Sequence, residues 1–226
     1  MTDPAIATAA DYADALLTAR RAKNLLVLVV LLMLLIQLAV FFVVKYTGLV
    51  YPMTSTAAPA TAPSMESNTQ QFWHSVAQYG IGASEFVGVA GTILVALVLY
   101  LITQIMVVGR LIGVSRVISA LVWTFVVLLL IFPWQAFLRD QTLHSREWIF
   151  PGVLYSWEEL LSRVTMGTRG DDAPISKLVL HWARFVAWPL LAIIMLLSIQ
   201  VKSNRGLRQA LGEEVIDTRD VTPPAV

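Results

Sequence analysis

Cysteine is absent from the 226-residue chain, and histidine occurs only three times. The first absence excludes a disulfide framework, a thiolate nucleophile and a cysteine-ligated metal. The three histidines have neither the H-x-x-x-H spacing nor the histidine–carboxylate motif of zinc proteases. We therefore predict no metal site, no cofactor and no catalytic group. The histidines are His74, His144 and His181.

Charged residues are also scarce, at 14% of the chain, and the formal net charge is only +1. Soluble domains contain about 25% charged residues. Because no large basic patch is visible, nucleic acid is not a predicted partner. Hydrophobic residues make up 57% of the chain and are concentrated in four long runs, which is typical of a polytopic membrane protein.

Each apolar run is long enough to cross a hydrocarbon core of about 30 Å, because an α-helix rises about 1.5 Å per residue. The runs do not alternate between apolar and polar residues, so helices rather than strands are predicted. The sequence therefore predicts an all-α polytopic membrane protein with four transmembrane helices and short amphipathic helices in its outer loops. The predicted spans are residues 24–44, 86–109, 117–138 and 178–201, and the outer loops are residues 45–85 and 139–177.

Lysine and arginine residues flank one end of each predicted span, and such flanks stay in the cytoplasm. This pattern predicts a protein of a bacterial inner (plasma) membrane with both termini in the cytoplasm. Residues 1–23 are predicted to form an amphipathic segment, and residues 202–226 a partly disordered tail. The flanking cations are Arg20, Arg21, Lys23, Arg110, Arg116, Lys202, Arg205 and Arg208.

Small residues recur every four positions near the start of the second predicted span, and they allow another helix to approach closely. We expect this seam to pack inside the protein, against the third or fourth span, although a contact with another molecule would use the same residues. The first span has almost no small residues and is predicted at the rim of the bundle, with Gln37 turned inward. The seam comprises Ser84, Gly88, Gly91, Thr92 and Ala96.

The second outer loop contains an amphipathic segment with helix signals. Ser156 and Glu159 have the spacing of a capping box, which marks the start of a helix. The apolar stripe of this helix should face either the protein's own bundle, as a lid, or a partner protein, as a docking surface. The stripe comprises Val153, Trp157, Leu160, Leu161 and Val164.

A further helix is predicted in the first outer loop, starting at Ser67. Phe72, Val76 and Tyr79 recur at helical spacing and make one apolar face. His74 falls on the opposite face, so the pattern predicts a solvated imidazole rather than a metal ligand.

Arg184 is the only charged residue inside a predicted span. It lies about 9 Å below the outer end of that span, a depth from which its side chain can reach the interface. His181 lies on the same helical face, and Glu85, predicted at the same level, is the first candidate for an ionic partner, ahead of Glu158 and Glu159. Arg184, His181 and Glu85 therefore form the candidate site, either as an internal ion pair and interfacial anchor or as a site for a ligand or lipid headgroup.

These features favour a non-enzymatic scaffold or accessory subunit of a multi-protein inner-membrane assembly. The expected partners are the lipid bilayer and either other membrane proteins or further copies of this chain. One alternative is transport or binding of a small or lipidic anion at the outer half of the bundle, centred on Arg184. A further alternative is a redox subunit that holds a cofactor through His181.

Overall fold

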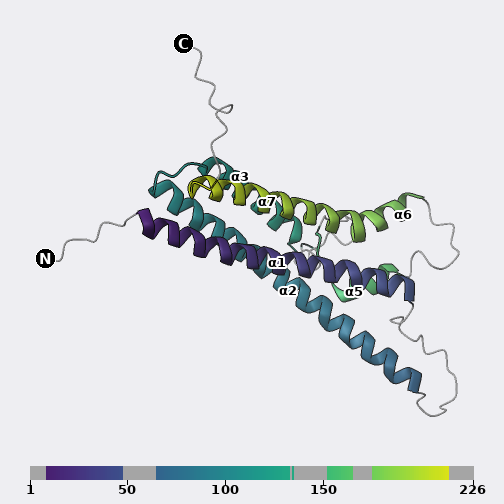
Figure 1. Ribbon diagram of the computed structural model, residues 1–226. Coiled ribbons are helices and arrows are strands. Elements are labelled where there is room, and N and C mark those ends of the chain that lie inside the picture. Colours follow the sequence, from purple (N-terminus) through teal and green to yellow (C-terminus); the bar gives the residue numbers. More distant parts are fainter. Residues whose placement is uncertain (1–8, 48–64, 133, 135–151, 165–174, 214–226) are drawn as a thin grey trace, which may run out of the picture.

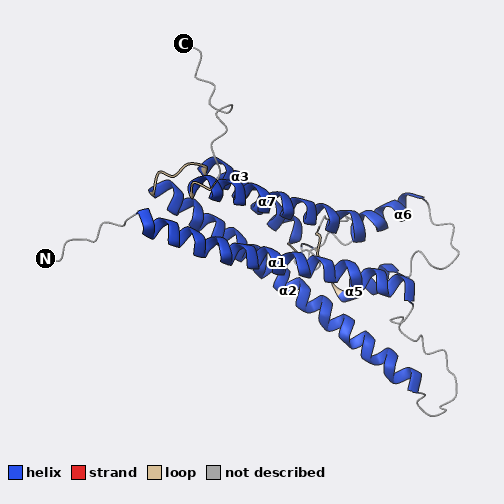
Figure 2. Ribbon diagram, viewed as in Figure 1, coloured by secondary structure: helices blue, strands red, loops and turns tan. Residues whose placement is uncertain are grey.

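The computed structural model describes residues 9–47, 65–132, 134, 152–164 and 175–213. Every regular element in these ranges is a helix (Figure 2). Four of the helical segments are long and apolar enough to cross a membrane. The predicted all-α polytopic membrane architecture is therefore confirmed.

The first two helices are longer than the predicted spans. Helix α1 (Ala9–Thr47) joins most of the predicted N-terminal segment to the first span, and α2 (Met65–Val108) joins the helix predicted from Ser67 to the second span. Neither helix contains a proline, so the backbone hydrogen bonds continue from one predicted segment into the next. With 44 residues, α2 is about 66 Å long.

A tight turn connects α2 to α3 (Val114–Ile131). The turn contains Arg110 and Gly113, both with positive φ angles, of 52° and 91°. The third predicted span continued to residue 138, but α3 ends at Ile131. Phe132 has a ψ of 132°, the extended conformation that a following proline favours.

The fourth span is one long helical segment with a π-helical turn inside it. It consists of α6 (Ile175–Trp182), the π-helix Ala183–Ala187 and α7 (Trp188–Ala210). The predicted span ended at residue 201, so α7 continues into what was predicted as the C-terminal tail. The short amphipathic helix is present as α5 (Trp157–Val164).

The long helices form a closed four-helix arrangement. Both α1 and α3 pack against α2 and α7. The start of α1, the α2–α3 turn and the end of α7 lie at one end of the molecule, and we call this the termini end (Figure 1). The opposite end holds α5 and α6, and we call it the loop end. The principal core includes Val30, Leu34, Leu99, Val117, Ala120 and Leu196.

The small-residue seam of α2 packs against α1, not against the third or fourth span as expected. A Cβ atom on Gly91 would lie 2.8 Å from Val30 Cγ2, and one on Gly88 would lie 3.9 Å from Met33 Cβ. Ser84, Thr92 and Ala96 are also buried. The small residues of α2 make room for the large side chains of α1, so one face of α1 packs closely in the bundle. Its other face, with Leu25, Leu28 and Leu32, is exposed, as expected for a helix at the rim.

Candidate functional site

A short stretch before α5 enters the loop end of the bundle. The backbone N–H of Val153 donates to the Leu130 carbonyl at the end of α3, over 2.8 Å. The Leu154 side chain lies over Gly88 of α2, where a Cβ atom would be 3.3 Å from its Cδ1. Val153, Leu154 and Tyr155 are all buried. Residues 153–155 therefore fill space between the long helices, which the sequence did not predict.

The apolar stripe of the amphipathic helix faces the protein itself. Val153, Trp157 and Leu160 are buried, and Leu161 packs against the same cluster. The side chain of Val164 lies outside the described residues. Of the two interpretations left open by the sequence, the arrangement matches a lid on the bundle, because the described stripe is covered by the protein's own helices.

Arg184 is buried and makes its ion pair with Glu159 of α5. Its Nε donates to Glu159 Oε1 over 3.0 Å, and its Nη2 donates to Glu159 Oε2 over 3.1 Å. The same Nη2 also donates to the Leu154 carbonyl over 3.1 Å. This bidentate geometry is the strong form of an arginine–carboxylate contact. The guanidinium therefore ties α5 and the preceding stretch to the fourth span.

Glu85, the first candidate for the ionic partner of Arg184, is not the residue that forms this ion pair. It is half-buried on α2, near enough to Glu159 for the two carboxylates to repel each other. The sequence favoured Glu85 because it is predicted at the same level as Arg184. Glu159, ranked after it, also belongs to the predicted capping box. The Glu159 N–H does donate to Ser156 Oγ, over 3.3 Å, but the Glu159 side chain points to Arg184. A carboxylate interpreted as a local cap thus serves a contact 25 residues away in the sequence.

Tyr155 connects the inserted stretch to α1. Its hydroxyl donates to the backbone carbonyl of Gln37. Burial raises the pKa of the Tyr155 phenol, so the hydroxyl stays protonated and remains a donor at neutral pH. Gln37 faces inward as expected, yet within the described part of the chain neither atom of its side-chain amide has a hydrogen-bond partner, and Arg184 Nη1 has none either.

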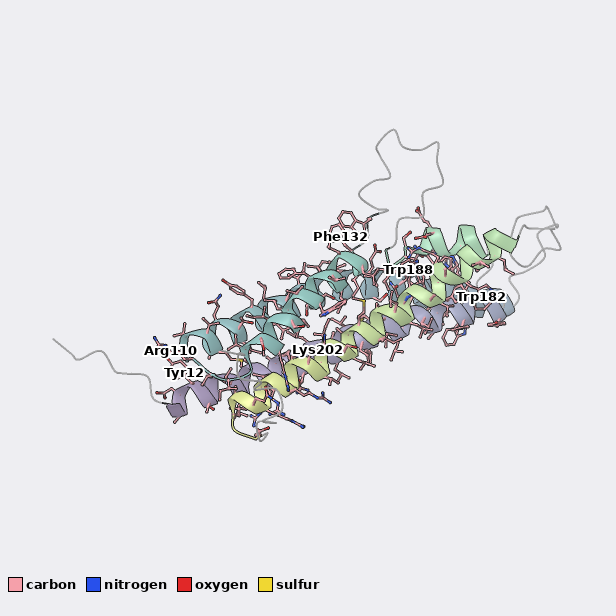
Figure 3. All side chains as sticks on the ribbon, turned by 90° about the horizontal axis from the view of Figure 1, so that it is seen from above. Tyr12, Arg110, Phe132, Trp182, Trp188 and Lys202 are labelled. Carbon is pink, nitrogen blue, oxygen red and sulfur yellow. The ribbon has the colours of Figure 1, made fainter. Side chains whose placement is uncertain are left out.

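His181 belongs to an aromatic cluster around the ion pair. Its ring centroid lies 5.0 Å from that of Phe185 and 5.7 Å from that of Phe41. Phe41 and Phe185 stack in parallel at 5.0 Å. Beside them, Lys45 Nζ lies 3.8 Å from the centroid of the Trp182 ring. This cluster lies at the loop end of the molecule, where Figure 3 shows Trp182.

The other histidines do not join His181. His74 packs edge-on against Trp157 of α5 at 5.0 Å, so its ring contacts the bundle on one side and is half-buried, where a solvated imidazole was expected. His144 lies outside the described residues. Within the ranges that the structure describes, no three His, Asp or Glu side chains form a group that could hold a metal ion.

A second polar contact lies near the termini end. Lys23 of α1 is buried and donates to Ser203 Oγ and Asn204 Oδ1 of α7, each over 2.7 Å. One turn away, Gln200 Nε2 donates to Asn24 Oδ1 over 2.7 Å. The sequence analysis treated Lys23 only as a flanking cation. Ser203 and Asn204 follow the predicted fourth span after Lys202. This polar pair could have indicated the partners of Lys23.

Comparison with known proteins gives no match to a family model, to a curated protein or to a solved structure.

Proposed function

We propose that this protein is a non-enzymatic scaffold or accessory subunit of a membrane assembly, and that a helix of another membrane protein docks along the outward face of α2. The proposal rests on one observation, which is an exposed aromatic face, covered by none of the described residues, on the part of α2 nearest the loop end. Phe72 and Tyr79 are 61% and 78% exposed.

The length of α2 supports this proposal. A hydrocarbon core of about 30 Å needs only about 40 Å of helix even at a tilt of about 40°. The 44 residues of α2 extend for about 66 Å. The end of α2 at Val108 is followed by the cationic turn, so we place the excess at the start of the helix. Lipid tails would not cover the aromatic residues there.

The spacing of the exposed residues suits a helical partner. They recur at alternating intervals of four and three positions, which is the heptad pattern of a helix that packs along another helix. Such a face offers aromatic anchors at its centre, the residue type that dominates binding energy in protein interfaces. The residues are Phe72, Val76, Tyr79, Ala83 and Phe86.

The alternative of anion binding at the loop end has less support. Arg184 Nη1 has no partner among the described residues, which favours a further polar contact there. Against this, Glu159 accepts two hydrogen bonds from the same guanidinium and neutralises its charge. Glu85, a second carboxyl group, lies near Glu159 and offers no attraction to an anion. An approaching anion would meet two carboxyl groups and one cation. For the redox alternative, the candidate ligand His181 packs against two phenylalanine rings, and the ring contacts of the described residues place no second histidine beside it.

Site-specific photo-crosslinking in native membranes tests the docking face. With p-benzoylphenylalanine in place of Tyr79, we expect one discrete protein adduct, identifiable by mass spectrometry. The matched control places the same group at Gln78, the preceding residue, which is also exposed but lies on the adjacent face of α2. We expect several-fold less adduct there.

Equal adducts from both positions, or none from Tyr79, would overturn the proposal. An adduct with the mass of two copies of this chain would show that the docking partner is a second copy. The proposed accessory role would then be replaced by homo-oligomer formation. A Tyr79→Ser variant should also migrate faster than the wild type on native gels in mild detergent, because it loses the partner while its own bundle is intact.

A further inference from the structure

An open pocket of about 310 Å³ lies between α3 and α7 near the termini end. Two helices supply its polar groups. Ser115 and Ser119 are one turn apart on α3, and Lys202 and Arg205 are one turn apart on α7. Arg116 completes the lining. The pocket thus combines three cations with two hydroxyl donors, and its lining contains no carboxylate.

Close packing of the two helices brings these groups together. A Cβ atom on Gly206 of α7 would lie 2.8 Å from Val117 Cγ2 and 3.0 Å from the Gly113 carbonyl. With glycine at this position, α7 approaches the start of α3 directly beneath the pocket. Gly113, the N-cap of α3, provides no side-chain cap, and the first turn contains no acidic residue. The positive end of the helix dipole therefore adds to the cationic field of the pocket.

The surface that continues from the pocket toward the loop end is apolar and uncovered. On α3, Val122, Trp123 and Val126 follow Ser115 and Ser119 along the same side of the helix and are exposed. On α7, Val201, next to Lys202, and Ile194, two turns nearer the loop end, are exposed. Lys202 Nζ lies 5.4 Å from the centroid of the Trp123 ring, at the border between the cationic and the apolar surface. Figure 3 shows Lys202 between the termini end, marked by Tyr12 and Arg110, and the more distant Trp182.

We propose that this pocket binds the phosphate group of an anionic phospholipid, whose acyl chains lie along the apolar surface of α3 and α7. Cations and hydroxyls are the groups that recognise a phosphodiester, and basic pockets between transmembrane helices are suited to lipid headgroups. A soluble phosphate would use the cations alone. A lipid uses the cations and the adjoining apolar surface together. The site does not depend on the docking face of α2, which belongs to the other half of the molecule.

Native mass spectrometry of the delipidated full-length protein in detergent tests this site. The probes are short-chain phosphatidylglycerol, phosphatidylcholine of the same chain length, and inorganic phosphate. We expect phosphatidylglycerol to bind in clear preference to phosphatidylcholine, and millimolar phosphate not to displace it. Each of Lys202→Gln and Arg205→Gln should weaken phosphatidylglycerol binding by about fivefold, because each removes one cation near the headgroup.

Arg208→Gln is the matched control, since Arg208 is an exposed cation on the same helix but does not line the pocket. It should change binding by less than twofold. An equal loss in Arg208→Gln would show diffuse attraction to the basic end and overturn the site. Displacement by inorganic phosphate at equal concentration would assign the pocket to a soluble anion. Equal binding of phosphatidylcholine would show that the cations of the pocket do not select the lipid, and would overturn the proposal.

Discussion

At the scale of single residues, the Arg184–Glu159 pair determines how the loop end is held together. Arg184 is 1% exposed, and the Glu159 side chain is 9% exposed. A buried charge without its partner is strongly unfavourable, although a buried pair replaced as a whole can be neutral in stability. The two hydrogen bonds to Glu159 and the one to the Leu154 carbonyl therefore hold the inserted stretch in place only while both charges are present.

Glu159→Gln should lower the free energy of unfolding by about 3 kcal/mol, because the guanidinium would stay buried beside a neutral amide. Thermal unfolding in detergent, followed by tryptophan fluorescence, measures the loss. The exposed neighbour Glu158 provides the control, and Glu158→Gln should change stability by less than about 0.5 kcal/mol.

A double variant completes this test. Glu159→Leu combined with Arg184→Met removes both charges and should recover most of the stability lost in Glu159→Gln. If Glu159→Gln unfolds at the same temperature as the wild type, the ion pair does not hold the loop end.

At the scale of helices, a π-helical turn changes which residues face the bundle, and a small-residue seam sets the distance between two helices. The π-helical turn at Ala183–Ala187 inserts one extra residue into the helical register, so α6 and α7 present different faces from those of a regular helix. Arg184 lies within this turn and is buried. On α2, the seam places small residues against the large side chains of α1, which determines how closely these two helices approach.

Gly91→Ala should destabilise the bundle by about 1–3 kcal/mol, because the added methyl group would lie 2.8 Å from Val30 Cγ2. Gly82→Ala is a control on the same helix. Nothing lies within 4 Å of a Cβ atom at Gly82, and alanine favours a helix over glycine by about 1 kcal/mol, so this variant should be neutral or more stable. Unfolding of both variants in the same detergent checks the prediction.

Val30→Ala in the Gly91→Ala background should restore part of the lost stability, because it removes the clashing methyl group. A Gly91→Ala variant as stable as Gly82→Ala would contradict the close α1–α2 packing.

At the scale of the whole molecule, the distribution of charge gives the bundle a polarity. The predicted flanking cations lie toward the termini end, on the first part of α1, in the α2–α3 turn, in the first turn of α3 and on the last part of α7. Cationic ends of membrane helices stay on the cytoplasmic side. This distribution supports the proposal that both termini face the cytoplasm.

Cysteine labelling tests the orientation directly, because the wild-type chain contains no thiol that would react. Ala15→Cys places a thiol on an exposed position near the termini end, and Gln71→Cys places one on an exposed position of α2 near the loop end. In whole cells, a membrane-impermeant maleimide should label Gln71→Cys at once and Ala15→Cys only after lysis. The reverse pattern would invert the topology.

The sequence predicted the features that depend on local composition. Four apolar segments, their helical form, the basic termini end and the amphipathic α5 follow from hydrophobicity and from spacing within one segment. The predicted helix ends were less accurate. Helices α1, α2 and α7 extend beyond the predicted spans through polar residues, and no proline interrupts these extensions. The actual end of α3, by contrast, is consistent with Pro133, the residue that follows Phe132.

Only the tertiary structure decided which residues meet. Arg184 pairs with Glu159 and not with Glu85 because the inserted stretch, residues 153–155, places α5 next to the fourth span. The α2 seam packs against α1 because the large side chains of α1 fit against the small residues of α2. Hydrophobicity is a property of each segment and can be read along the chain. Contacts between distant residues depend on register, side-chain volume and a single π-turn, which come together only when the helices pack.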